Sequence, residues 1–481
     1  MIMIVLLVIG LVAGLIGSLS ISALRTSRQK QTAAVLAQAK DALIGFAVKV
    51  QVSSSDIACA TTSNCPRPGD LPCPDTDNDG IAETSCGDAA GSTGQASRLG
   101  RLPWKTLGLP DLRDGSGERL WYAVSNNFKN NTRTICNNSN LTGCLNSDTP
   151  GTISIFASDG TLTNDAGVAG TGVVAVIIAP GEALQRTDKS TTQNRSIAGS
   201  NDPLNYLEIF NDYLDKINAS YPHTLINEDN ANFSDGSSTN GFIRGPIKFL
   251  SGLGSDSDRV IVNDQLLVIT QDNIMQPVQK RVSGEVKNCL LEYVAMPQNR
   301  ASPSSGWWGY YPWAADVKLS GSNYIYEDND KLKYGHIPDL PFDRTCQDTN
   351  GNNCNGSQTG SAMSNSWGAT CSLNNNNWWV NWKELVFYSF GNNFRPHLHG
   401  TSLYDHVCPD VSECIKVSPP SALIDKGFVL IVAGKKLPGQ ARSSVADKNN
   451  RSNYMEGANS TSGTFEQSPA SSTFNDIVVF K

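Results

Sequence analysis

The sequence lacks most of the short motifs that identify enzymes. It contains no G-x-x-x-x-G-K-[ST] loop, no G-x-S-x-G turn and no H-E-x-x-H pair, and only 5 of its 481 residues are histidine. These absences argue against an ATPase, an α/β-hydrolase and a zinc protease. Three of the histidines lie at 396–406 and leave an anchored hydrolase as the weakest alternative. We expect a protein that is not an enzyme.

Long basic runs are also absent. The formal net charge is −7, and only 17% of the residues are charged. Nucleic-acid-binding surfaces need clustered positive charge, so we do not expect nucleic acid as a partner. A chain of this length is too long for one ordinary domain, and two globular units of roughly 200 residues each are the starting expectation.

Charge is missing altogether from residues 1–24, MIMIVLLVIGLVAGLIGSLSISAL. As a helix this run would be about 36 Å long, enough to cross a bilayer. A cleaved signal peptide is the alternative, but the run is long for one and no basic segment precedes it. We expect a transmembrane helix. Arg25, Arg28 and Lys30 follow it, and the positive-inside rule alone would keep the rest of the chain in the cytoplasm.

The twelve cysteines indicate the other side of the membrane. A cytosolic zinc ribbon would need C-x-x-C pairs, and none occurs. Several cysteines instead form close pairs in loops rich in Asn, Gly and Pro, as in disulfide-stapled proteins of oxidising compartments. We give this pattern more weight than the positive-inside count. The disulfide candidates are Cys59, Cys65, Cys73, Cys86, Cys136, Cys144, Cys346, Cys354, Cys408 and Cys414.

Six short matches recur in the same order in two halves of the chain. LWYAVSNNF at 120–128, for example, matches VFYSFGNNF at 386–394. The other matches pair an apolar helical pattern at 35–50 with one at 275–293, 69–75 with 309–316, 173–185 with 429–442, 194–208 with 450–456, and 263–270 with 475–481. In the fifth, Asn-Arg-Ser is followed by Asn-Tyr in both halves. A shared order indicates internal duplication.

These patterns predict an α+β fold. The N-terminal transmembrane helix should continue into an amphipathic helix packed on an antiparallel sheet, with the α+β unit duplicated. The predicted domains are the transmembrane helix at 1–24, a first lobe at 25–271 and a second, related lobe at 272–481.

The N-terminal architecture resembles that of type IV pilins and pseudopilins. The resemblance lies in residues 1–24 followed by QTAAVLAQAKDALIGFAV at 31–48, in LPCPDTDNDGIAE at 71–83, and in the segment 100–128. It implies leader removal by a prepilin peptidase and assembly with other pilins or pseudopilins on an inner-membrane platform. The implied location is the bacterial inner membrane, with periplasmic or extracellular domains. A large exterior and the absence of Glu near the helix start favour a minor, tip-located subunit.

Small residues in the predicted span suit lateral helix packing. Gly10 and Gly14 form a G-x-x-x-G pair, and Gly17 extends it. Small residues let helices approach closely in lipid, although glycine is also common in membrane spans generally.

The sequence DTDNDG at 75–80 is the sharpest candidate for a metal site. Alternating carboxylates followed by glycine are typical of loops that bind Ca²⁺. The predicted ligands are Asp75, Asp77, Asp79, the carbonyl of Ile81, and Glu83. Cys86 stands where an EF-hand has its bidentate Glu, so a structural Ca²⁺ of modest affinity is one interpretation. An acidic turn tied by Cys73 and Cys86 is the other.

Tryptophan pairs in the second lobe are candidates for partner or ligand binding. They are Trp307 with Trp308 and Trp378 with Trp379. Neighbours on a strand point to opposite faces, so some of these rings should be exposed and able to stack on a surface ligand. Core packing is the alternative. Exposed rings would also suit a second function, a signal-anchored periplasmic or surface binding protein (an adhesin for carbohydrate or a host surface) unrelated to pili.

Overall fold

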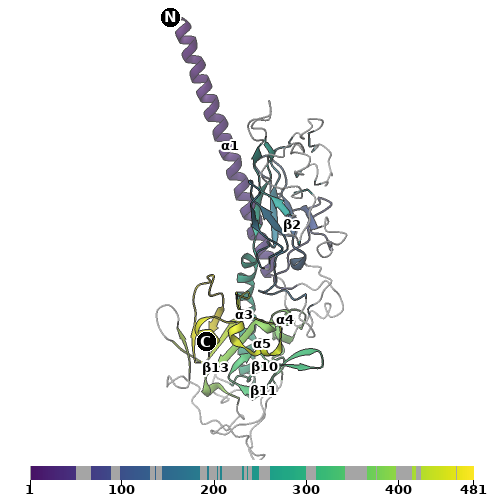
Figure 1. The fold of residues 1–481 in the computed structure, drawn as a ribbon, viewed down its shortest axis with the longest axis vertical. Helices are drawn as coiled ribbons and strands as arrows, with labels where there is room; N and C mark the ends of the chain where they lie inside the picture. The colour runs from purple at the N-terminus through teal and green to yellow at the C-terminus, as the bar shows by residue number, and fades with distance from the viewer. Residues whose placement is uncertain are drawn as a thin grey trace, which may run out of the picture. The chain divides into compact units, whose positions relative to one another are not determined.

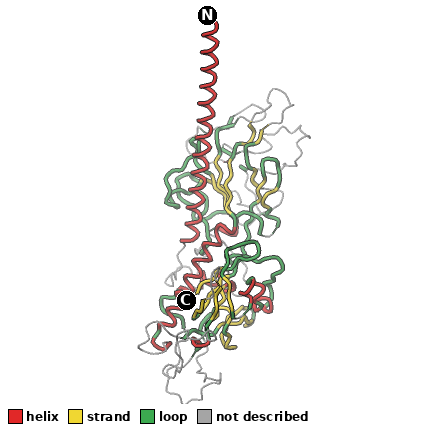
Figure 2. The backbone as a smooth tube through the Cα atoms, turned by 90° about the vertical axis from the view of Figure 1, so that its left-hand side faces the viewer, coloured by secondary structure: helices red, strands yellow, loops and turns green. Residues whose placement is uncertain are grey.

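The chain has a mixed α+β fold with several antiparallel sheets, as predicted (Figures 1 and 2). The computed structural model describes residues 2–49, 67–87, 98–129, 136, 143–168, 170–184, 192–193, 195, 203, 206–207, 230–231, 236, 241–248, 260–299, 310–341, 366–374, 376–396, 414–418, 424–461 and 463–480. It divides into two compact units. Unit 1 comprises 1–47, 70–131 and 150–271, and unit 2 comprises 48–69, 132–149 and 272–481.

Unit 1 begins with the helix α1 (Ile2–Lys49), which lies along the unit in both views (Figures 1 and 2). Its buried positions recur every three or four residues, at Thr32, Leu36, Ala39, Leu43 and Ala47. This spacing places them on one face of the helix. The predicted amphipathic segment is thus helical, with its apolar stripe buried.

The structure describes the side chains of α1 from Ile21 onward, and the candidate packing residues Gly10, Gly14 and Gly17 lie outside that part. Within the part of the chain that is described, no helix is long and apolar enough to cross a membrane.

Two sheets complete unit 1. The larger has the order β1 (Leu99–Arg101), β2 (Trp121–Val124), β5 (Ala175–Ala179), β9 (Gln265–Ile269), all antiparallel. The smaller has the order β4 (Leu162–Asn164), β3 (Ser154–Phe156), β6 (Gly241–Ile243), with β3 antiparallel to β4 and parallel to β6. A separate pair joins β7 (Ile247–Lys248) to β8 (Val260–Val262).

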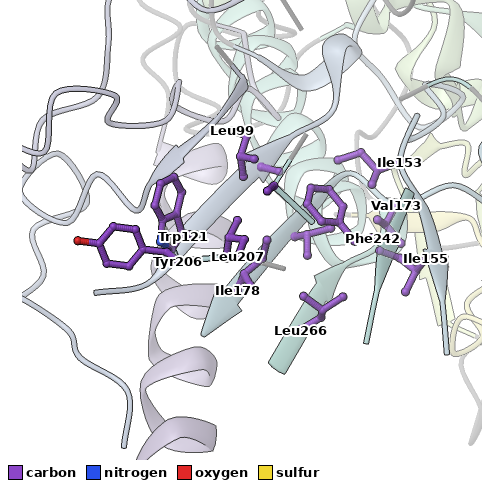
Figure 3. Close-up of a cluster of buried hydrophobic side chains, with 13 residues drawn as sticks. Leu99, Trp121, Ile153, Ile155, Val173, Ile178, Tyr206, Leu207, Phe242 and Leu266 are labelled. Carbon is purple, nitrogen blue, oxygen red and sulfur yellow. The ribbon is translucent and has the colours of Figure 1, made fainter. Parts of the chain in front are cut away.

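The core of unit 1 draws on both sheets. Trp121, Ile178 and Leu266 from the larger sheet meet Ile155 and Phe242 from the smaller one (Figure 3). Trp121 and Ala123 belong to this cluster whereas Tyr122 between them does not, because successive side chains of a strand point to opposite faces.

Unit 2 has the same kinds of element. Its helix α3 (Gln271–Ala295) buries every position that the sequence pattern predicted, namely Met275, Val278, Val282, Val286, Cys289, Leu290 and Tyr293. Its larger sheet has the order β11 (Asn323–Leu332), β10 (Ala314–Ser320), β12 (Tyr334–His336), β13 (Val386–Phe390), β16 (Phe428–Val432), β18 (Ile477–Phe480). Its smaller sheet has the order β15 (Ile424–Lys426), β14 (Ile415–Ser418), β17 (Thr464–Glu466). Two short helices are α4 (Asn376–Trp382) and α5 (Val445–Asn449).

The two units share their strand order. The series β1-β2-β5-β9 in unit 1 has the connectivity of β12-β13-β16-β18 in unit 2, and β4-β3-β6 has that of β15-β14-β17. The odd pair in each smaller sheet is parallel in both units, β3 with β6 and β14 with β17. Unit 2 adds the hairpin β10–β11 at the edge of its larger sheet.

Equivalent hydrogen bonds accompany this shared order. Tyr122 donates to the carbonyl of Pro72 at 3.2 Å, and Tyr388 in unit 2 donates to the carbonyl of Pro312. The segment before each of these prolines is tied to the turn after the tyrosine strand. The backbone N–H of Leu71 donates to Phe128 at 2.7 Å, and that of Tyr311 donates to Phe394 at 2.9 Å.

A buried Asn–Asp pair also occurs in each unit. Asn230 donates to Asp264 at 2.9 Å in unit 1, and Asn459 donates to Asp476 at 3.0 Å in unit 2. Each asparagine accepts from the last residue of the parallel strand, β6 or β17, at 2.8 Å and donates back to its carbonyl. All four side chains are buried. The pair thus links the smaller sheet of each unit to the start of its last strand.

The structure corrects one of the predicted matches. Arg195 donates to the carbonyls of Gly181 and Tyr206, and its counterpart in unit 2 is Arg442, which donates to the carbonyls of Gly434 and Tyr454. Both arginines contact a glutamine two residues earlier and lie over the ring of their tyrosine. The Asn-Arg-Ser alignment, which paired Arg195 with Arg451, is therefore wrong. The equivalent contacts align the Gln-x-Arg sequence at 193–195 with the one at 440–442.

Candidate functional site

The predicted metal loop follows the segment that pairs with β1. Asp75 exchanges both backbone hydrogen bonds with Arg101, at 2.7 and 3.0 Å, so the loop leaves from the sheet edge. The loop turns through positive φ at Asn78 (67°) and Gly80 (86°). A Cβ atom at Gly80 would lie 2.6 Å from Nε1 of Trp104, so glycine is required there for space as well as conformation.

Three of the five predicted ligands come together. Carboxylate oxygens of Asp75, Asp77 and Glu83 all lie within 4.8 Å of one another. Asp79 is not part of this group, and its Oδ1 accepts from the backbone N–H of Ile81 at 2.7 Å. Ile81, predicted as a carbonyl ligand, is exposed.

The carboxylates of the loop also organise its backbone. Asp75 is buried and accepts from the N–H groups of Asn78 at 2.6 Å and Gly80 at 2.8 Å, while Glu83 accepts from Thr76. Burial raises the pKa of Asp75, and the negative charges of Asp79 and Asp77 add to the increase. The two backbone N–H groups act in the opposite direction. These hydrogen bonds form an Asx turn from the loop's own atoms, and Ca²⁺ binding stays a prediction.

Disulfides close two of the predicted loops. Cys73 is bonded to Cys86, which ties the two ends of the acidic loop, and Cys136 is bonded to Cys144. Cys414 is also disulfide-bonded. The other candidates, Cys59, Cys65, Cys346, Cys354 and Cys408, lie outside the described residues.

A third disulfide, Cys289–Cys371, was not predicted. It joins α3 to a turn 82 residues away in the sequence. Cys289 belongs to the apolar stripe of α3, so the sequence pattern indicated a residue of the core and gave no sign of a disulfide. The absence of a close sequence partner was the available signal.

The tryptophan prediction is wrong where it can be examined. Trp378 and Trp379 lie on the helix α4 instead of a strand, and each is only 1% exposed. Trp382 is fully buried on the same helix, so these rings form core rather than a binding platform. Trp307 and Trp308 lie outside the described residues, as do the histidines at 397, 399 and 406.

Comparison with protein-family models, with curated proteins and with solved structures finds no match for this chain.

Proposed function

We propose that this protein is a minor pilin-like or pseudopilin-like component of a type IV pilus or a related secretion machine, anchored in the membrane by residues 1–24. The observation that carries the proposal is the continuity of α1. One helix runs from Ile2 to Lys49, its first part is the charge-free run, and its later part buries an apolar stripe in unit 1. The same division between an inserting half and a packing half characterises the pilin family.

The helix contacts the rest of unit 1 in a way that suits a rigid stalk. Thr32 accepts from the backbone N–H of Gly115 at 2.9 Å, and Lys40 donates to the carbonyl of Val268 at 3.2 Å. Gly115 approaches so closely that a Cβ there would lie 2.3 Å from the carbonyl oxygen of Arg28. A helix held at these points along its packed half can transmit force from a membrane anchor to the exterior.

The repeated contacts support the proposal that the exterior arose by duplication of one α+β unit. Lys287 of α3 donates to the carbonyl of Phe480 on β18, as Lys40 donates to Val268 on β9. A second lobe lacking its own membrane segment would enlarge the exterior without adding an anchor. That suits a single subunit at a tip better than a repeating shaft subunit.

The decisive experiment is N-terminal sequencing and intact mass of the protein recovered from its native membrane. Prepilin-peptidase maturation predicts an N-methylated end at the start of the apolar run. An unprocessed and unmethylated end would overturn the pilin-like assignment.

A helix swap provides a functional test. Replacing residues 1–24 with an unrelated single-span helix of equal length should keep the protein in the membrane but abolish its incorporation into filaments. Replacing the three glycines Gly10, Gly14 and Gly17 by alanine is the matched, milder variant. Normal incorporation of the swapped protein would indicate an ordinary anchor and favour the surface-binding alternative.

A further inference from the structure

Unit 2 contains a pocket beside β12 that has no assigned role. Its volume is about 160 Å³. Its lining includes Tyr334, Gly335 and His336 of β12 and Phe387 of β13. Pockets for drug-sized ligands are usually about 300 Å³ or more, so this one suits a molecule of about ten non-hydrogen atoms or fewer.

Two opposite charges line this pocket. Asp316 of β10 and Arg451, just after α5, are both half-buried, and within the described residues no ion pair joins them. Arg451 is held in place, because its guanidinium donates to the carbonyl of Tyr334 at 3.3 Å and lies 4.5 Å from the centre of that ring. Burial raises the pKa of Asp316, and the nearby Asp330 adds to this, while Lys318 and Arg451 oppose it. A half-buried carboxylate without a direct partner is stabilised by a cationic ligand.

The rest of the lining is uncharged and partly polar. His336 is 1% exposed, and burial lowers its pKa to about 4, so the imidazole is neutral at pH 7. Asn449 is fixed by two hydrogen bonds with the backbone of Val317, at 2.7 and 2.9 Å. A Cβ at Gly335 would lie 2.6 Å from the carbonyl oxygen of Ala315, so the close approach of β12 to β10 requires glycine at this position. The pocket is therefore preorganised, which lowers the cost of binding.

Unit 1 shows what this part of the fold accommodates. Arg101 occupies the strand position equivalent to His336, because it pairs with Trp121 as His336 pairs with Phe387. Its guanidinium lies 4.2 Å from the centre of the Trp121 ring and 3.9 Å from that of Tyr206. Unit 1 thus places its own cation against aromatic rings. In unit 2 the neutral imidazole of His336 takes this position, with its ring centre 3.9 Å from that of Phe387 and 6.0 Å from that of Tyr454, so the cation is replaced by an uncharged ring.

We propose that unit 2 binds a small zwitterion, of the class of the free amino acids, in the pocket beside β12. Asp316 accepts hydrogen bonds from the ammonium group, and Arg451 donates to the carboxylate. The side chain of the ligand lies against Phe387 and Leu332. This site is independent of the membrane anchor and of the pilin-like assignment.

The test is isothermal titration of the detergent-solubilised full chain with the free L-amino acids, one at a time. At least one should bind saturably with Kd of about 1 mM or below. The matched half-ligands, lacking either the ammonium or the carboxylate of the best binder, should bind at least tenfold more weakly. Asp316→Asn and Arg451→Gln should each weaken binding about tenfold or more.

Asp272→Asn is the control, because it removes the same charge and a half-exposed ion pair with Lys435 from unit 2 without changing a lining residue. It should leave Kd within about twofold, and thermal unfolding should show that all three variants are folded. The proposal is overturned if no amino acid binds, or if binding survives both pocket substitutions. Equal affinity for a half-ligand would overturn the zwitterionic assignment.

Discussion

At the residue scale, equivalent buried polar contacts stabilise each of the two units. Tyr122 and Tyr388 are both fully buried, and burial raises the pKa of each well above its ordinary value, so both hydroxyls stay protonated donors. Their acceptors are carbonyls of prolines, Pro72 and Pro312, in the segment that follows each long helix. A buried carbonyl that loses its donor keeps the cost of leaving water.

Tyr122→Phe and Tyr388→Phe should therefore each lower the free energy of unfolding by about 1–3 kcal/mol. Tyr324→Phe is the control, because its hydroxyl makes an exposed bond of 3.4 Å, and its effect should stay below about 0.5 kcal/mol. Urea unfolding of the solubilised chain measures all three. Similar midpoints for all variants would show that the tyrosine bonds do not stabilise the fold.

Two aspartates of unit 2 should give opposite pH dependences. Burial and the neighbouring Glu456 raise the pKa of Asp476 well above its ordinary value, so the folded state binds this proton more tightly than the unfolded state. Stability therefore falls as the pH rises above about 4, and Asp476→Asn should gain stability relative to the wild type over this range.

Asp447 behaves in the opposite way. Hydrogen bonds from Ser444 and Ser443 lower its pKa to about 2. The stability that the ionised carboxylate contributes is therefore present at a pH above the ordinary pKa of 3.8 and is lost as the pH falls toward 2. Asp447→Asn should therefore be destabilising at pH 7 and neutral near pH 2. Urea midpoints between pH 2 and 8 test both variants, and parallel profiles would contradict the assignment.

At the scale of the element, long periodic segments were predictable and short ones were not. The stripe of α3 was predicted in full because 25 residues display several turns of the 3.6-residue period. The helix α4 has 7 residues, too few to show the helical period. Its paired tryptophans are equally compatible with a strand. The acidic loop was predicted through its residue types, but only the folded backbone separates Asp79 from the other carboxylates.

The disulfides of unit 2 differ in the length of loop that they close. Cys289–Cys371 spans 82 residues and Cys136–Cys144 spans 8. Because loop closure restricts the unfolded chain more when the loop is longer, serine replacement of the first pair should cost about 4–5 kcal/mol and of the second about 2–3 kcal/mol. Denaturant unfolding of the two double variants measures the difference. Equal losses would contradict the loop-closure explanation.

Calcium binding is the prediction that belongs to the acidic loop. If Asp75, Asp77 and Glu83 hold Ca²⁺, a chelator should lower the thermal midpoint of the wild type by several degrees, and Asp77→Ala should remove this sensitivity. Asp159→Ala, in an exposed turn elsewhere in unit 1, should keep it. Identical midpoints with and without chelator would leave the loop as a plain Asx turn.

At the scale of the whole molecule, the units are interleaved along the chain. The segment 132–149 belongs to unit 2 although it stands between two parts of unit 1. Its contacts are specific: Leu145 donates to Asn381 at 2.9 Å, and Asp148 forms an ion pair with Arg442 at 2.8 Å. The sequence placed this segment within 25–271, because contacts that cross such a distance leave no local pattern.

A fragment of residues 272–481 should consequently be less stable than unit 2 in the full chain. Without 132–149, the largely buried Arg442 loses its carboxylate and Asn381 loses two partners. Adding an oxidised peptide of residues 132–149 should raise the thermal midpoint of the fragment, and an Asp148→Asn peptide should do so less. A fragment unaffected by either peptide would contradict the interleaved assignment.

The interleaving also sets the order in which the two units can fold during synthesis. A chain that emerges from its N-terminus presents residues 132–149 long before the partners of that segment, Asn381 and Arg442, exist. Unit 1 contains no residue beyond 271 and can fold first. The segment 132–149 then remains without its partners until the rest of unit 2 has been synthesised. Unit 2 can therefore fold completely only after the whole chain has been synthesised. A truncated chain lacks a complete second unit even when its first unit has folded.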